Sequence, residues 1–184
     1  MDYGVIGNCK SAALVDRRGT VVWCCLPDFD SASVFASLLD DERGGSFGID
    51  VDGSYRVTQD YVPNTNVLRT VFESPAGGFE LYDLMPRHKE GGGYYAPPEL
   101  LRYLRTTHGR PVFRVRYVPR LGYARHETFS ESHGVYIKSM VREGAYESLY
   151  LYTNLPHREV LEGCELALEG EAYLLLSYHQ KVRT

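Results

Sequence analysis

The sequence predicts an all-β protein, an antiparallel β-sandwich with one short helix near residues 31–41. Three observations predict this class. Nine segments after residue 45 have the residue pattern of strands, and glycine- and proline-rich turns separate them at intervals typical of sandwiches. The chain also holds 15 tyrosines, a residue type that strands favour.

Length and composition favour a single domain over residues 1–184. A chain of this length buries a core without disulfides, and 43% of its residues are hydrophobic. The net charge is −4 and the basic residues are scattered, so nucleic acid is not an expected partner. No apolar run is long enough for a membrane span and no leader pattern opens the chain, so we expect a cytoplasmic protein.

The first predicted element is a β-hairpin. Apolar runs at residues 12–15 and 21–26 flank the turn "DRRG", in which Gly19 takes the position with positive φ. The four cysteines include no C-x-x-C pair, and we expect free thiols, with a contact from Cys9 to Cys24 or Cys25 left open.

The second predicted element is the short helix. Ser31 or Ser33 is positioned to cap it, and the pair Gly44-Gly45 ends it. Its apolar face would consist of Val34, Phe35, Leu38 and Leu39.

The remaining elements are strands. In "PVFRVRYVPR", Phe113, Val115 and Tyr117 alternate with Arg114 and Arg116, which predicts one buried and one solvated face. The loop "EGGGYYAPPE" is expected to be the flexible one. The nine segments are "SFGIDV", "SYRVTQDYV", "NVLRTVFES", "GFELYDLM", "LLRYLRTTH", "PVFRVRYVPR", "GVYIKSMV", "SLYLYT" and "EAYLLLSYH".

A search for chemistry among these residues identifies little. Phosphate-binding glycine loops and a G-x-S-x-G elbow are missing, and the six histidines lack the spacing of metal ligands, so we expect no cofactor and no metal. The most site-like carboxylates are Asp28 and Asp30, which flank Phe29 after a strand. The alternative, that Asp30 forms an Asx-turn or caps the helix at Ser31, is favoured.

Ordered motifs along nearly the whole chain resemble a known family. They are "YGVIGNCKSAALVDRRGTVVWCCLPDFDSASVFASLLDDERGGSFGI", "YVPNTNVLRTVFE", "LYDLMPR" and "PVFRVRYVPRLGYAR". In this order they resemble the amino-terminal region of bacterial and archaeal glycoside hydrolase family 15 proteins, which include glucoamylases, glucodextranases and trehalase-like enzymes.

The resemblance implies a supersandwich-type accessory domain without catalytic residues. In the family an (α/α)6 barrel follows the sandwich and carries the catalytic glutamates, and the chain is expected to lack that barrel. The implied partner is the barrel, in the same chain or a separate one, and the implied substrates are α-glucosides. The residues expected to contact the barrel or the sugar rim are Pro27, Asp28, Phe29, Asp30 and Ser31.

Three positions depart from the family pattern. Val22 replaces a usual acid, Asp28 a usual arginine and Ala32 a usual proline. Because arginine only donates hydrogen bonds and a carboxylate only accepts them, Asp28 cannot reproduce a contact made by that arginine. Trp23 and Leu26 are expected to face the core, and residues 28–31 the solvent.

A second interpretation makes the chain a stand-alone carbohydrate-binding module, in which Tyr94, Tyr95 and Tyr123 provide stacking surfaces in exposed loops. A third makes it the subunit of a split hydrolase, differing from the first only in gene structure. In the first and third interpretations an exposed apolar docking face would favour a homodimer of the isolated chain.

Overall fold

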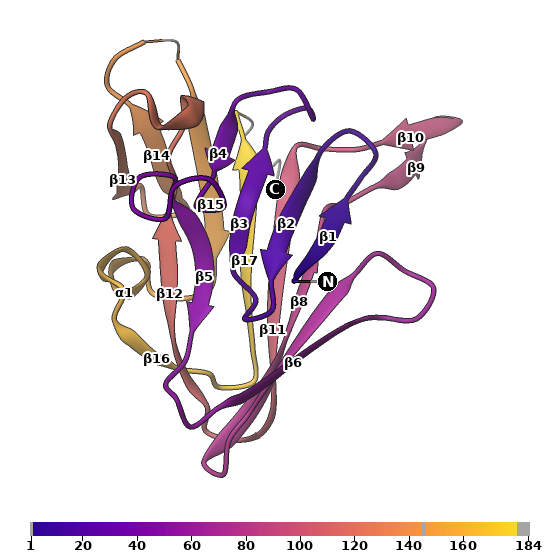
Figure 1. Ribbon diagram of the computed structural model, residues 1–184, viewed down its shortest axis with the longest axis vertical. Helices are drawn as coiled ribbons and strands as arrows, with labels where there is room; N and C mark the ends of the chain where they lie inside the picture. Colours follow the sequence, from indigo (N-terminus) through magenta and orange to yellow (C-terminus); the bar gives the residue numbers. More distant parts are fainter. Residues whose placement is uncertain (1, 145, 180–184) are drawn as a thin grey trace.

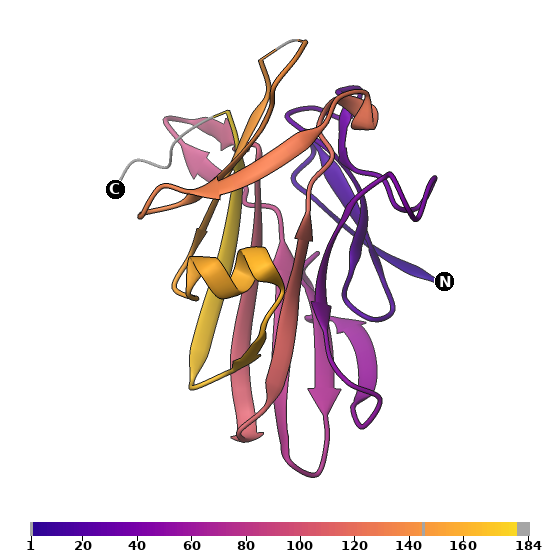
Figure 2. The same ribbon diagram turned by 90° about the vertical axis from the view of Figure 1, so that its left-hand side faces the viewer.

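Two large antiparallel sheets face one another in the structure, a computed structural model that describes residues 2–144 and 146–179. Figure 1 shows the first sheet in front of the second, and Figure 2 shows the layers from the side. This arrangement confirms the predicted all-β fold class. The first sheet, sheet A, is ordered β1 (Tyr3–Gly7), β2 (Ala12–Asp16), β3 (Val21–Cys25), β5 (Ser46–Asp50), β12 (Val112–Val118) and β16 (Glu165–Ala167), with β4 (Ser33–Phe35) paired to β3.

The second sheet, sheet B, contains most of the strands predicted from the sequence. All nine predicted segments are strands, and the unpredicted ones are β1, β4, β13, β16 and the two strands of a small separate hairpin. That hairpin, β9 (His88–Glu90) and β10 (Gly93–Tyr95), occupies the stretch expected to be a loop. Sheet B is ordered β13 (Thr128–Ser132), β14 (Ile137–Val141), β15 (Ser148–Thr153), β17 (Glu171–Tyr178), β11 (Glu99–Gly109), β8 (Gly77–Leu84), β7 (Leu68–Glu73) and β6 (Arg56–Tyr61).

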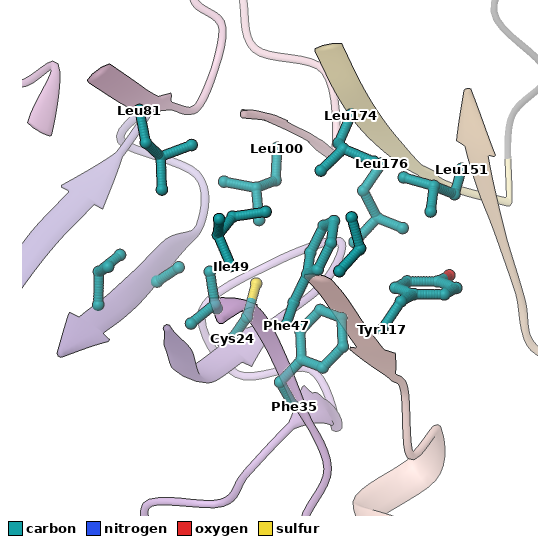
Figure 3. Close-up of a cluster of buried hydrophobic side chains, with 14 of the residues drawn as sticks. Cys24, Phe35, Phe47, Ile49, Leu81, Leu100, Tyr117, Leu151, Leu174 and Leu176 are labelled. Carbon is teal, nitrogen blue, oxygen red and sulfur yellow. The ribbon is translucent and has the colours of Figure 1, made fainter. Parts of the chain in front are cut away.

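The core lies between the sheets and follows the alternation of the strands. On β12, Phe113, Val115 and Tyr117 are buried while Arg114 and Arg116 face solvent, as predicted. The Tyr117 ring meets the Phe47 ring edge-on at 5.2 Å between centroids, within the cluster drawn in Figure 3. Leucines from β11, β15 and β17 approach this cluster from sheet B, so residues from both sheets fill the core.

The prediction of a helix near residues 31–41 is wrong, because pairing with a neighbouring strand overrides the local residue pattern. Residues 33–35 form β4, in which Phe35 pairs with Cys24 of β3, and residues 37–39 and 41–43 form turns. Phe35 is fully buried while Leu39, one helical turn later, is 72% exposed, so these two side chains share no apolar face. The backbone N–H of Ala36 instead donates to the Gly44 carbonyl at 2.8 Å.

The α-helix lies elsewhere, in the connection from β15 to β16. Helix α1 (His157–Glu162) follows Pro156 and ends at Gly163, whose φ of 63° is the left-handed conformation that glycine adopts freely. Its buried residue is Val160, and the helix contacts β12 and β13. Six residues give too short a periodic pattern to be recognised in the sequence. One 3-10 turn, η1 (Gly122–Ala124), precedes β13.

The expected inward orientation of Trp23 is also wrong. The predicted hairpin of β2 and β3 forms, with Gly19 at φ 78°, but Leu14 pairs with Trp23 and Val15 with Val21. Val22 is the extra residue of a β-bulge, which reverses the alternation of side chains along β3. Trp23 therefore points away from the core and is only partly buried. Leu26 is buried, as expected.

A buried ion pair lies on the inner face of sheet B. Arg102 of β11 and Asp83 of β8 lie directly opposite one another in sheet B, both fully buried, with Nε 2.7 Å from Oδ1. The guanidinium also donates to the carbonyls of Gly19 and Phe47 in sheet A and lies 4.8 Å from the Phe47 ring centroid. Arg102 therefore links the two sheets by hydrogen bonds as well as by packing.

Candidate functional site

The conspicuous loops gather at one end of the sandwich, which we call the loop end and define as residues 8–11, 26–32, 86–97 and 121–125. Hydrogen bonds connect these segments one to the next. Phe29 N donates to the Lys10 carbonyl at 3.0 Å, and the Tyr123 hydroxyl donates to the Ser31 carbonyl at 3.3 Å. The last strand also reaches this end, because Tyr178 N donates to the Pro98 carbonyl at 3.0 Å.

Asn8 is the anchor of the loop end. Its side-chain oxygen accepts hydrogen bonds from the backbone N–H groups of Lys10 and Ser11, each at 3.0 Å. Its amide nitrogen donates to the carbonyls of Pro97 at 2.9 Å and Pro86 at 3.4 Å, which lie on either side of the β9–β10 hairpin. Asn8 is only 2% exposed, so one buried amide holds both the turn and the base of the hairpin.

The predicted contact residues form a tight turn at this end, which we call the 27–31 loop. Asp28 N donates to Ser31 Oγ and Ser31 N donates to the Asp28 carbonyl, each at 3.1 Å. The side chain that closes the turn is therefore Ser31, and the favoured Asx-turn or helix cap by Asp30 is wrong. Among the described residues, Asp30 accepts no backbone hydrogen bond.

The loop presents an apolar ring between charged groups. Phe29 is 60% exposed, and Asp28 forms an ion pair with Lys10 at 3.4 Å. Both partners of that pair are about half exposed, so its contribution to stability is on the order of 0–1 kcal/mol. Asp28, one of the three positions that depart from the pattern quoted above, thus already has a partner within the domain.

A groove of about 370 Å³ separates the turn at residues 8–10 from the β9–β10 hairpin. On one side of it Arg87 lies 4.4 Å from the Tyr94 ring centroid and donates to Cys9 Sγ at 2.9 Å. The three tyrosines proposed as stacking surfaces are all exposed: Tyr94 and Tyr95 line this groove, and Tyr123 lies on the opposite side of the 27–31 loop.

The structure thus brings together residues that are far apart in the sequence. The 27–31 loop and Tyr123 meet directly, while Tyr94 and Tyr95 stand across the groove. Sequence reasoning missed Asn8, Lys10 and Arg87. The signal for Asn8 was its place in the quoted "IGNC" motif, but an exposed-looking asparagine in a turn does not disclose that its amide reaches residues almost 90 positions away.

The described residues offer no metal centre, since no group of three or more histidine, cysteine or acidic side chains is placed to hold an ion. The four cysteines are free, Cys9 exposed and Cys24 and Cys25 buried. Burial raises the pKa of the Cys24 and Cys25 thiols, so these two groups behave as small apolar side chains. Across residues 2–144 and 146–179 no helix has the length and apolar character needed to cross a membrane.

The fold and the loop end define the class of protein. It is an all-β sandwich domain with a surface of loops at one end, and the buried side-chain amide of Asn8 holds two of these loops in place. The chain belongs to the family described as trehalase-like, N-terminal, whose family model matches residues 2–140. This membership confirms the resemblance seen in the sequence at the level of a trehalase-like amino-terminal domain.

Similar proteins are trehalases. Trehalase 1 of Sulfolobus acidocaldarius is 51% identical over 85 residues, which are 45% of this chain and 14% of that protein. Trehalase 2 of the same organism is 28% identical over 185 residues, covering 100% of this chain and 29% of that protein. The trehalase of Thermoplasma volcanium is 34% identical over 133 residues, 70% of this chain and 21% of that protein.

The chain spans less than a third of the length of these curated relatives. No solved structure was found to match it. The similarity therefore concerns the amino-terminal domain of the family.

Proposed function

We propose that the chain is the non-catalytic accessory domain of a glycoside hydrolase of family 15 type that acts on α-glucosides. Residues 1–184 form the sandwich, and a catalytic (α/α)6 barrel is its partner, in the same polypeptide or a separate one. The domain packs against the barrel, supports its folding and forms part of the rim of its sugar pocket. A cytoplasmic location belongs to the same proposal and is supported by the free thiols.

The observation that carries the proposal is the rigid, apolar-tipped 27–31 loop in a trehalase-like amino-terminal domain. Phe29 is 60% exposed at the tip of the loop, so its ring is available to contact a partner. Ser31 Oγ and the Lys10 carbonyl accept hydrogen bonds from the backbone of the loop, and the Tyr123 hydroxyl donates one to it. The loop therefore needs no ordering before it binds a partner. This loop and its charged neighbour Asp28 are therefore our docking residues.

The first test is catalysis by the chain alone. Purified residues 1–184 are expected to hydrolyse none of trehalose, maltose, isomaltose or starch, because the proposed catalytic carboxylates belong to the barrel. Glucose release is measured by a coupled assay over many hours at high protein concentration. Turnover that follows the folded protein through size-exclusion chromatography would overturn the assignment.

The second test removes the docking ring. In a fusion that joins residues 1–184 to Sulfolobus acidocaldarius trehalase 2 in place of its matching segment, Phe29→Ala is expected to weaken the domain contact by about 1–3 kcal/mol. The result is a lower trehalase activity or a lower melting temperature of the fusion. The isolated variant domain should unfold as the unaltered one does, because Phe29 packs in no core.

The matched control is Val135→Ala, which trims another exposed apolar side chain in the turn between β13 and β14. It should leave the fusion unchanged. Equal behaviour of the Phe29 and Val135 variants in activity and melting temperature would show that the 27–31 loop is not the contact.

A stand-alone carbohydrate-binding module is the second candidate, favoured by the exposure of Tyr94 and Tyr95 on the groove and of Tyr123. Titration of the isolated chain with maltooligosaccharides and with trehalose, repeated with Tyr94→Ala, tests this candidate. Self-association through Phe29 in the absence of a barrel is measured in parallel by sedimentation, and it should disappear in Phe29→Ala.

A further inference from the structure

Three tyrosines stand side by side on the outer face of sheet B, the face turned away from the core. Tyr82 of β8 lies opposite Tyr103 of β11, which lies opposite Tyr173 of β17. Their chain neighbours Leu81, Leu104 and Leu174 point into the core. Adjacent strands are about 4.8 Å apart, so the tyrosine row extends over about 10 Å. This is the span of two linked pyranose rings.

Hydrogen bonds hold the hydroxyls of Tyr82 and Tyr103 toward one side of the row. The Tyr82 hydroxyl donates to Glu80 Oε2 at 2.7 Å, two residues along the same strand. A hydrogen bond to Glu171 raises the pKa of Tyr103. A ring whose hydroxyl is tied to a neighbour on the same sheet leans over the sheet, and the ring centroids of Tyr82 and Tyr103 are 6.2 Å apart. Tyr82 and Tyr103 are partly buried and Tyr173 is 40% exposed, and the Arg105 guanidinium lies 5.7 Å from the Tyr82 ring centroid, so the accessible part of the row is largest toward Tyr173.

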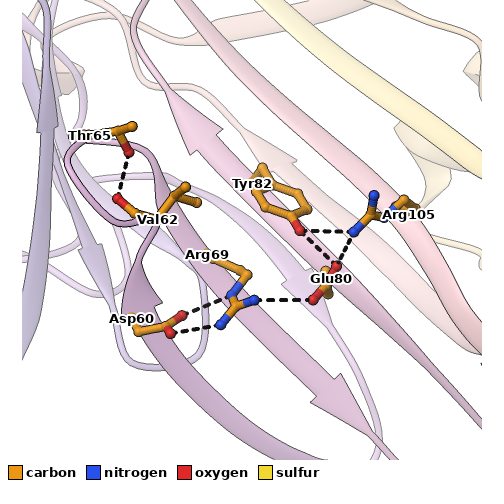
Figure 4. A network of polar contacts seen from close by, with 7 residues as sticks. All are labelled: Asp60, Val62, Thr65, Arg69, Glu80, Tyr82 and Arg105. Carbon is orange, nitrogen blue, oxygen red and sulfur yellow. Dashed lines mark hydrogen bonds and ion pairs between the residues drawn. The ribbon is translucent and has the colours of Figure 1, made fainter.

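A network of paired charges lies beside Tyr82, at one end of the row, as Figure 4 shows. Glu80 lies between two guanidinium groups, with Oε2 2.8 Å from Arg105 Nη2 and Oε1 3.5 Å from Arg69 Nη1. Arg69 also forms two bonds to Asp60, at 3.0 and 2.8 Å. The side chain of Arg105 is 52% exposed and that of Asp60 55%, so donors and acceptors of this network remain accessible.

This combination suits a sugar better than a protein surface. The C–H faces of pyranose rings pack against aromatic rings, and adjacent hydroxyls of a sugar match carboxylates and forked guanidiniums. A protein interface of this size would instead have few charged residues near its centre. The charges here are already paired, so they are fixed in position before a ligand arrives.

We propose that the tyrosine row of sheet B, Tyr82, Tyr103 and Tyr173, with Glu80 and Arg105 beside it, binds an α-linked glucoside of two or three rings. The choice of an α-linked glucoside rests on the proposed function, whereas the site itself is distinct from the loop end and does not depend on the docking of a barrel. The open, flat face implies weak binding, with a dissociation constant on the order of 1–10 mM.

The experiment titrates residues 1–184 with maltotriose and with trehalose and follows the amide and aromatic NMR signals. At least one of the two sugars should shift the signals of the tyrosine row. Tyr103→Ala, at the centre of the row, should weaken binding about ten-fold or more, and Tyr103→Phe, which keeps the ring, should weaken it less. Tyr3→Ala, which removes a tyrosine as exposed as Tyr173 from β1 of sheet A, is the matched control and should bind as the unaltered chain does, while Tyr94→Ala tests the loop end as the alternative site.

Circular dichroism establishes whether each variant is folded. If Tyr103→Ala is not, Tyr173→Ala replaces it, because Tyr173 is 40% exposed at the margin of the row. The proposal is overturned if neither sugar shifts any signal at several tens of millimolar, well above the expected constant. It is equally overturned if Tyr94→Ala abolishes binding while the variants of the row retain it. Neither result bears on the Phe29 fusion.

Discussion

Replacement of Arg102 by methionine is expected to lower the free energy of unfolding by about 3–5 kcal/mol, because it leaves the carboxylate of Asp83 buried without its partner. Arg102 provides both bonds to Asp83 and the bonds to the Gly19 and Phe47 carbonyls, and both charged side chains are fully buried. Denaturant unfolding followed by circular dichroism measures the loss.

The loss should depend on pH. Burial raises the pKa of Asp83, and the charge and hydrogen bonds of Arg102 oppose that rise. Without Arg102, the folded-state pKa of Asp83 lies above its unfolded value, so folding favours the protonated acid. The variant is then destabilised as pH rises through the folded-state pKa, and its deficit relative to the unaltered chain is larger at pH 8 than at pH 5.

Two further variants separate the buried charge from loss of a long side chain. Arg105→Met makes the same change on the same strand at an exposed position and should cost at most about 1 kcal/mol. Arg102→Met combined with Asp83→Leu removes both charges and should be more stable than Arg102→Met alone. A double variant less stable than the single one would contradict the account of Asp83 as an uncompensated charge.

The strands could be predicted from sequence because each carries its own signal. On β12 the alternation of Phe113, Val115 and Tyr117 with arginines defines both faces without tertiary information. The helix prediction for residues 31–41 fails for the opposite reason. The local pattern suits a helix, but Phe35 pairs with β3 and is buried in the core. Pairing between segments distant in sequence is not encoded in any short window.

The buried ion pair and the loop end show the same limit. The alternation of β11 places Arg102 on the inward face between Leu100 and Leu104, and the alternation of β8 places Asp83 on the inward face of its own strand. The sequence does not reveal that the two residues lie opposite one another and form an ion pair. At the loop end, the exposure of Phe29 could be predicted from its loop. Its support by Lys10 and Tyr123 depends on three separate connections between strands coming together.

Asn8→Ala is expected to lower the free energy of unfolding by about 2–4 kcal/mol and to release the loop end. The substitution removes acceptors for two backbone N–H groups and a donor for the Pro97 and Pro86 carbonyls, and buried polar groups without partners cost about 1–3 kcal/mol each. Hydrogen exchange should become faster in residues 8–11 and in the β9–β10 hairpin before it does so in sheet B. Urea unfolding gives the global value.

Asn8→Asp separates the two halves of that anchor. A carboxylate still accepts from the N–H groups of Lys10 and Ser11, so the turn should keep its protection from exchange, but it cannot donate to Pro97 and repels that carbonyl. Protonation restores a donor, so we expect the stability deficit of this variant to shrink as pH falls through the range where the introduced carboxylate titrates. Equal loss of protection in the turn and the hairpin would show that Asn8 does not hold them separately. If only the hairpin loosens, the side-chain amide of Asn8 fixes the position of the hairpin and therefore the width of the groove beside Tyr94. The shape of the loop end then depends on Asn8 and not on the 27–31 loop.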